Sequence, residues 1–119
     1  QASVCPVTST VIEKAAFYLE HADAIGLSEQ QVQAIKAIKL EAKKAAVRQK
    51  AEMEVFHLDI KAKMADPAVK AEDLNAMVDG TAQGMSTSVK AMLAEYAKLK
   101  AVLSDEQQKN AKEVLGKRR

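Results

Sequence analysis

The sequence predicts an all-α protein of four helices, one of them unusually long for so short a chain. Apolar residues recur at helical spacings of three and four along most of the 119 residues. A stretch of about 38 residues, 28–65, contains neither Gly nor Pro and would form a rod roughly 57 Å long. Large side chains are scarce, with two Phe, two Tyr and no Trp. Together these observations predict a thin, hairpin-like helical layer without a thick globular core.

The composition indicates one domain that is either a thin helical layer or a dimer that completes its core with a second copy. Apolar types make up 48% of the chain, but many are Ala, which contributes little burial energy. We therefore expect a single helical domain over residues 10–118, with a homodimer as one way to complete its core. Residues 1–9 show no helical period and are predicted to be disordered or extended.

The first two helices are predicted from the residues at their ends. Helical spacing begins near Thr10 and stops at Gly26, a typical C-terminal cap. Ser28 is a candidate N-cap for the long second helix, since its hydroxyl can accept from the free N–H groups of the first turn. Asp66-Pro67 ends that helix, because proline disfavours helical backbone at the residue before it.

The third helix is expected from about Glu72 to Val102, and the fourth from Ser104 to Gly116. Two glycines lie inside the third helix, where each costs about 1 kcal/mol relative to Ala. They belong to a strip of small residues spaced by four, on which another helix could approach closely: Ala76, Gly80, Gly84 and Ser88. We expect one bent helix here; a break into two helices near Asp79 is the alternative.

The same five-residue pattern, Leu-Ser-x-x-Gln, opens both the second and the fourth helix. In each copy the serine is an N-cap, and the glutamine three residues later can accept from the N–H of the serine, which makes a capping box. The leucine before each cap can act as a hydrophobic staple. We assign this structural role to Leu27, Ser28, Gln31, Leu103, Ser104 and Gln107.

The long helix carries many lysines on the side opposite its main apolar seam. The seam follows heptad-like spacing through Val32, Ile35, Ala42, Ala46, Met53, Phe56 and Ile60. A second apolar strip, off the seam, contains Leu40, Val47, Val55 and Leu58. A lysine row on a helix is usually a solvated face; the alternative is a basic surface mixed with apolar patches that binds a partner.

Leu27–Gln31 and Leu103–Gln107 resemble the paired L-T-x-x-Q motifs of the Spy/CpxP family of periplasmic stress proteins, with Ser in place of Thr. The long second helix and the Asp-Pro break are also similar to that family, over about residues 10–118. The resemblance implies a periplasmic protein whose four helices form a thin, curved, antiparallel homodimer, with the paired motifs close together in space. Some members are ATP-independent chaperones that hold clients on the concave face. Others restrain an envelope-stress sensor kinase or bind heavy metals.

These implications, with the mixed basic and apolar surface, predict an ATP-independent holdase for unfolding envelope proteins during stress. Charge would speed the encounter, and adaptable apolar contacts would retain the client. The candidate client-binding residues are Lys36, Lys39, Leu40, Lys43, Val47, Arg48 and Val55. The periplasmic domain of a sensor kinase is a further candidate partner.

The alternative function is the binding or sensing of a heavy metal such as Zn, Ni, Co or Cu. It would need His, Met and carboxylate ligands gathered from several helices. The candidates are Glu20, His21, Met53, Glu54 and His57. The H-x-x-x-H pair of metal-sensing relatives falls on Phe17 and His21, so one ligand is missing. Two subunits could still share His57 and Glu54 across a dimer interface.

Other classes of protein find little support in the sequence. No glycine-rich phosphate loop, nucleophile elbow or H-E-x-x-H motif occurs, so we do not expect an enzyme. The net charge of +2 is too small to indicate nucleic-acid binding, and no apolar run is long enough to span a membrane. The single cysteine, Cys5, can remain a free thiol or pair with a second copy.

Overall fold

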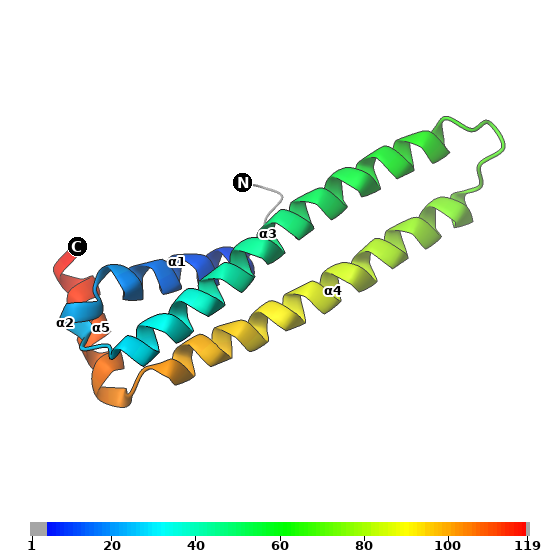
Figure 1. Ribbon diagram of the computed structural model, residues 1–119. Coiled ribbons are helices and arrows are strands. Elements are labelled where there is room, and N and C mark those ends of the chain that lie inside the picture. The colour runs from blue at the N-terminus through cyan, green and yellow to red at the C-terminus, as the bar shows by residue number, and fades with distance from the viewer. Residues whose placement is uncertain (1–4, 119) are drawn as a thin grey trace.

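The computed structural model, which describes residues 5–118, is a long helical hairpin closed at one end (Figure 1). Its helices are α1 (Pro6–Glu20), α2 (Ala22–Ile25), α3 (Glu29–Met64), α4 (Ala71–Val102) and α5 (Asp105–Arg118). α3 and α4 lie side by side and antiparallel, α1 packs along the half of this hairpin nearest its base, and α2 packs against α5 at the base. The molecule measures 62 × 25 × 18 Å, which confirms the predicted thin all-α architecture.

The first helix begins at Pro6, earlier than the predicted start at Thr10. Proline is well suited to the first helical position, where the backbone N–H would have no intrahelical partner. This added turn is anchored because Thr8 is completely buried. The segment 1–9, predicted to be disordered or extended, is therefore helical over residues 6–9. The part of that prediction that concerns residues 1–4 lies outside the described residues.

Five helices are present over residues 5–118 where four were predicted, because the first predicted helix is interrupted at His21. The backbone of His21 (φ −113°, ψ 30°) leaves the helical region, and the short α2 follows it. Gly26 ends α2 with φ 89°, a left-handed conformation that glycine adopts without steric cost. The C-cap role predicted for Gly26 is confirmed, but the helix it ends is α2.

The two long helices largely follow the prediction. α3 has 36 residues and ends just before Asp66-Pro67, and α4 runs without a break through Gly80 and Gly84. Apart from the adjoining backbone of α4, nothing lies within 4 Å of a Cβ built on either glycine, so none of the other described helices makes the expected close approach to them. The predicted end of the last helix at Gly116 is also wrong, since α5 continues to Arg118.

The buried core lies in the half of the hairpin nearest the base, where α1 contacts both α3 and α4. Its apolar members are Val11, Ala15, Tyr18, Ile25, Ile35, Ile38, Ala42, Ala45, Met92, Leu99, Leu103 and Ala111. The predicted seam of α3 is buried at Ile35 and Ala42 but only half-buried at Met53 and Phe56. Between residues 46 and 91 no residue is buried. We call this part of α3 and α4, residues 46–91, the distal hairpin.

Candidate functional site

The two Leu-Ser-x-x-Gln motifs form capping boxes at the starts of α3 and α5. Gln31 N–H donates to the Ser28 hydroxyl at 3.1 Å, and Ser28 N–H donates to Gln31 Oε1 at 2.8 Å. At the other corner, Gln107 N–H donates to the Ser104 hydroxyl at 3.2 Å, and Ser104 N–H donates to Gln107 Oε1 at 2.9 Å. Both predicted boxes are therefore present with the same geometry.

The two boxes are joined by their glutamines, which are 76 positions apart in the chain. Gln31 Nε2 donates to Gln107 Oε1 at 2.7 Å, and Gln107 Nε2 donates to Gln31 Oε1 at 2.9 Å. Each Nε2 also caps a backbone carbonyl beside the other motif: Gln31 donates to Val102 O at 2.8 Å, and Gln107 donates to Gly26 O at 2.7 Å. We call this set of contacts the glutamine junction.

The glutamine junction explains why both corners need the same residue type. A primary amide has two N–H donors and an oxygen that accepts two hydrogen bonds, and here each glutamine uses all four. Glutamate could not donate, and the shorter asparagine would not span the same distance. The repeated motif is therefore both a local capping box and a tertiary contact, which confirms that the two motifs lie close together as the family resemblance implies.

Two further polar residues of α5 hold the same end of the molecule and were not predicted from the sequence. Asn110 Nδ2 donates to Ile25 O at 3.1 Å, so it caps the end of α2. Gln108 Nε2 donates to Lys100 O at 3.0 Å, near the end of α4. Their partners are backbone carbonyls of other helices, which no spacing rule within α5 could have indicated.

The residues predicted to bind clients lie on the outer side of α3, away from its buried seam. Leu40, Val47 and Val55 are 53%, 70% and 55% exposed. The basic residues predicted with them are also exposed except for the half-buried Lys39. Within residues 5–118, Lys36 and Lys43 form no ion pair, so their charges are free to attract a partner.

Helical geometry divides the predicted client-binding set into three parts, of which Lys39 lies alone beside the buried seam. Lys36, Leu40, Lys43 and Val47 follow steps of four, three and four and so form one stripe, while Arg48 and Val55 lie about a quarter-turn away from it. The stripe continues toward the hairpin tip at Leu58, which is 69% exposed. We call this row of exposed apolar and basic residues on α3 the outer stripe.

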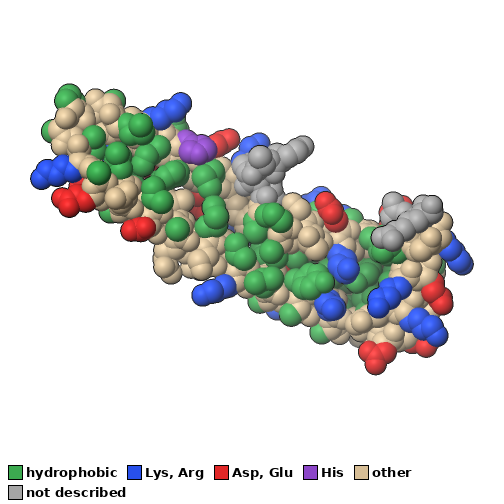
Figure 2. Space-filling model, turned by 180° about the vertical axis from the view of Figure 1, so that it is seen from behind, with side chains coloured by type: hydrophobic (Ala, Val, Ile, Leu, Met, Phe, Trp, Pro, Cys, Tyr) green, Lys and Arg blue, Asp and Glu red, His purple; other side chains and the backbone are tan. Residues whose placement is uncertain are grey.

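A second apolar surface lies on the face seen in Figure 2. Hydrophobic side chains gather there over the end of the molecule that holds the hairpin tip, with charged groups around them. On α4 the large exposed apolar residues are Val78 and Met85 in the distal hairpin and Leu93 just outside it, all about half exposed. The distal hairpin therefore presents apolar side chains from both of its helices.

The predicted metal ligands fall into two separate places. His21 and Glu20 lie at the end of α1 near the base, with His21 Nε2 3.9 Å from Glu20 Oε1 and its ring against Phe17 at 4.7 Å. Met53, Glu54 and His57 lie on α3 in the distal hairpin. No group of three or more His, Cys, Asp or Glu side chains is placed to hold a metal within the part of the chain that the structure describes.

One ionisable group in the core is clearly perturbed. Tyr18 is 6% exposed, and its burial raises the pKa of its hydroxyl above the usual 10.0, with a smaller contribution from the nearby Tyr96. Burial disfavours the charged phenolate, so Tyr18 is neutral throughout the physiological range. It contributes to packing between α1 and the hairpin.

The architecture places this chain among small helical hairpin proteins whose corners are joined by paired capping motifs. A comparison with protein families matches the LTXXQ motif family over residues 19–115. The chain belongs to this family, which is that of the Spy/CpxP-like periplasmic proteins. No match was found among curated proteins or solved structures. Over the described residues, no helix combines the length and apolar content that crossing a bilayer requires.

Proposed function

We propose that the protein is a periplasmic, ATP-independent holdase that binds unfolding proteins during envelope stress. The observation that supports this most directly is the exposure of large apolar side chains along the hairpin. On α3 and α4 these are Leu40, Val47, Val55, Leu58, Met64, Val78, Met85 and Leu93. Extended exposed apolar surface on a protein marks an interaction site, and here it follows most of the length of both helices.

The charges beside these residues suit the binding of many client proteins that share no particular sequence. On the outer stripe, lysines alternate with Leu40 and Val47, so a client meets a positive charge within about a turn of each of these apolar contacts. Such charges speed encounter, while methionine side chains such as Met64 and Met85 can adapt to clients of different shape. The contacts are weak individually, which allows release without a nucleotide.

The proposal includes a homodimer, because the distal hairpin cannot bury a core by itself. No residue between positions 46 and 91 is buried, and two helices that share one row of half-buried contacts are marginal in water. A second copy would cover part of this surface and leave the rest for clients. Periplasmic location rests on the family, and the proposal assigns no enzymatic activity. A sensor-kinase partner stays a prediction.

The proposal is tested by diluting a chemically denatured client into buffer without ATP and following its aggregation by light scattering. The full chain should suppress scattering at a near-stoichiometric ratio. The combined variant Leu40→Ser and Val47→Ser should lose most of this effect, because it removes two of the three large apolar side chains of the outer stripe. Circular dichroism would verify that the variant keeps its helices.

The matched control is Leu115→Ser, since Leu115 is also an exposed leucine, 42% accessible, but belongs to α5. This variant should protect the client as well as the natural chain does. If the wild-type chain fails to protect even in large excess, the holdase proposal is wrong. If Leu115→Ser and the stripe variant lose equal activity, the binding surface has been placed incorrectly.

A further inference from the structure

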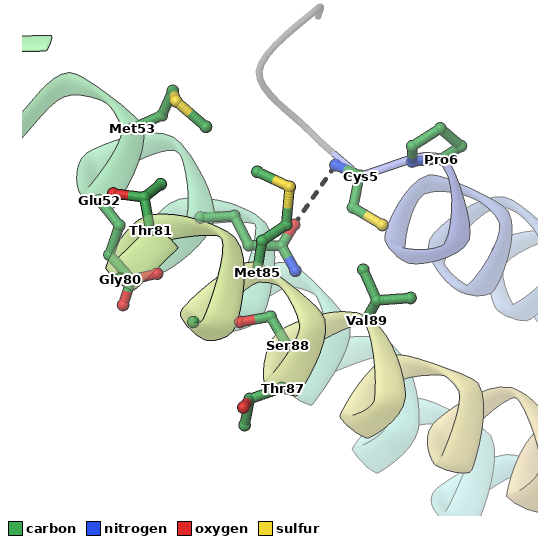
Figure 3. Close-up of a pocket in the computed structure, with 12 residues that line it drawn as sticks. Cys5, Pro6, Glu52, Met53, Gly80, Thr81, Met85, Thr87, Ser88 and Val89 are labelled. Atoms are coloured by element: carbon green, nitrogen blue, oxygen red, sulfur yellow. Dashed lines mark hydrogen bonds between the residues drawn. The ribbon is translucent and has the colours of Figure 1, made fainter. Parts of the chain in front are cut away.

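Two pockets open beside α1, and they differ in the charge of their linings. The larger, about 890 Å³, lies between the start of α1 and the facing helices α3 and α4 (Figure 3). Among its described lining residues the charged one is Glu52. The smaller, about 490 Å³, lies near the base between α1, the end of α4 and α5. We call it the base pocket, and its aromatic and basic lining residues are Phe17, Tyr18, Tyr96, Lys14, Lys100 and Lys112.

The aromatic side chains of the base pocket suit a ligand with a flat apolar body. Phe17 and Tyr18 line the pocket from α1, with ring centres 6.2 Å apart, while Tyr96 lines it from α4 and Leu115 from α5. Aromatic rings favour edge-to-face and offset-stacked contacts with another ring. Sites for small molecules are typically apolar and aromatic clefts of about 300–1,000 Å³ with a few polar groups, and the base pocket fits this description.

A buried hydroxyl group without a partner lies in the wall of the base pocket. Tyr18 is only 6% exposed, and its hydroxyl forms no hydrogen bond within residues 5–118. Unlike Gln49 Nε2, this hydroxyl is not completely enclosed, so it still faces the pocket. Because burial, with a smaller effect from Tyr96, raises the pKa of Tyr18, the hydroxyl keeps its proton at neutral pH. Buried polar groups are nearly always paired, so a ligand that accepts a hydrogen bond would complete this wall.

The charges around the base pocket are mostly positive. Lys14 lines it from α1, Lys100 from α4 and Lys112 from α5, and Glu13 is the acidic residue among the described lining residues. None of the three lysines forms an ion pair within the part of the chain that the structure describes. Lys100 Nζ lies 5.8 Å from the centre of the Tyr96 ring, which places a positive charge beside the aromatic wall. Three lysines against one glutamate favour an anionic ligand.

We propose that the base pocket binds a small aromatic carboxylate. The ring of the ligand lies among the aromatic side chains, and its carboxylate accepts hydrogen bonds from the Tyr18 hydroxyl and from the lysine ammonium groups. The ammonium groups can only donate and the carboxylate can only accept, so the two are complementary. A neutral ligand would leave the lysine charges without a partner, and a cation would be repelled by them. The pocket shares no residue with the outer stripe or the glutamine junction, so this proposal is independent of the holdase function.

The test is an NMR titration of the full chain with 3-phenylpropionate and, separately, with 3-phenylpropanamide, which keeps the ring but has no charge. We expect one site for 3-phenylpropionate with a Kd on the order of 0.1–1 mM, as befits so small a ligand. The amide should bind about tenfold more weakly, because it makes no charged contact with the lysines. Backbone signals of α1, α4 and α5 around the base pocket should shift, and those near Leu40 on the outer stripe should not.

Two variants separate the contributions of the hydroxyl and of the charges. Tyr18→Phe keeps the ring and removes the hydroxyl, so it should weaken the binding of 3-phenylpropionate about tenfold. The combined variant Lys14→Met and Lys100→Met keeps the apolar stems and should abolish the preference for the acid over the amide. The matched control is Lys109→Met, since Lys109 is an exposed lysine of α5 that does not line the pocket. This variant should bind 3-phenylpropionate as the natural chain does.

Three results would overturn the proposal, and two of them are measured on the natural chain, whatever the stability of the variants. Equal affinity for the acid and the amide would mean that the pocket recognises the ring and not the carboxylate. Shifts confined to the outer stripe would mean that the ligand binds at the client surface. A loss of affinity in Lys109→Met equal to that of the double lysine variant would mean that net charge alone attracts the ligand.

Discussion

At the scale of single residues, the molecule depends on two glutamines that each make a local and a distant set of contacts. Gln31 caps its own helix and also reaches Gln107 and Val102 O. Its removal leaves the Ser28 N–H, a carbonyl and half of the partner amide without their hydrogen bonds. Unsatisfied polar groups at a partly buried position cost more than the lost bonds alone.

Gln31→Ala should therefore lower the free energy of unfolding by about 2–4 kcal/mol. Gln107→Ala should cost a similar amount, and the double variant should cost less than the sum by about 1–2 kcal/mol, because the two amides share their bonds. Urea denaturation measures these values. The control is Gln33→Ala, whose side chain makes an exposed hydrogen bond to Glu29, so it should change stability by less than about 0.5 kcal/mol. Strictly additive losses would contradict the paired junction.

The raised pKa of Tyr18 predicts a loss of stability in alkaline solution. Because the folded state holds the phenolic proton more tightly than the unfolded chain does, the unfolded chain ionises first as the pH rises past about 10. Stability contributed by this group is complete below that pH and is lost as the pH passes through the raised pKa. Thermal unfolding between about pH 9 and 11 should show a smaller decrease for Tyr18→Phe than for the natural chain. Equal decreases would show that Tyr18 is not responsible.

At the scale of helices, Gly26 and Gly84 differ in backbone conformation, and this difference decides how each would tolerate a side chain. Gly26 needs its positive φ to end α2 and turn the chain toward Ser28. Gly84 lies inside α4 with ordinary helical backbone, and apart from the adjoining backbone of α4 nothing lies within 4 Å of the position that a Cβ would take there. The same substitution should therefore have opposite effects at the two positions.

Gly84→Ala should stabilise the protein by about 0.5–1 kcal/mol, since alanine has the better helix propensity and nothing blocks its methyl group. Gly26→Ala should destabilise it by about 1 kcal/mol or more, because an L-residue is strained at φ 89°. Chemical denaturation of both variants gives the two signs directly. Destabilisation by Gly84→Ala would mean that another chain packs closely on the small-residue strip.

At the scale of the whole molecule, the chain is far more extended than its length requires. Its radius of gyration is 19.1 Å, against about 14 Å for a compact domain of this size. The core holds α1, α2 and α5 to the base, whereas the distal hairpin lacks buried residues. Stability should therefore be unevenly distributed along the long axis.

Hydrogen exchange should reveal this difference and its dependence on association. Amides of the distal hairpin should be protected more strongly from exchange as protein concentration rises, because a second copy covers them. Amides of α3 between Ile35 and Ala45 lie in the core and should show the same protection at every concentration. Mass spectrometry of peptides from samples at several concentrations measures both regions. Concentration-independent protection of the distal hairpin would argue against the homodimer.

Local sequence rules were sufficient to predict which segments are helical and where most of them stop. Ser28, Ser104, Gly26 and Pro67 act within a few residues of themselves, so each boundary could be placed from its neighbours alone. The same rules could not place the start of α1 at Pro6 or the interruption at His21. Helix ends fray easily, and the start of α1 depends on the burial of Thr8, which its neighbours in sequence do not reveal.

Local sequence rules could not predict which distant residues meet; the family resemblance implied only that the two motifs lie close together, and the packing of the helices decided the contacts themselves. The packing joins Gln31 to Gln107, keeps the two groups of predicted metal ligands apart and brings Tyr18 to the same pocket as Tyr96 and Lys112. Periodicity places a side chain on a face of its own helix but carries no information on the register between helices. That register is set here by the core contacts of α1 and by the glutamine junction, which act between residues far apart in the chain.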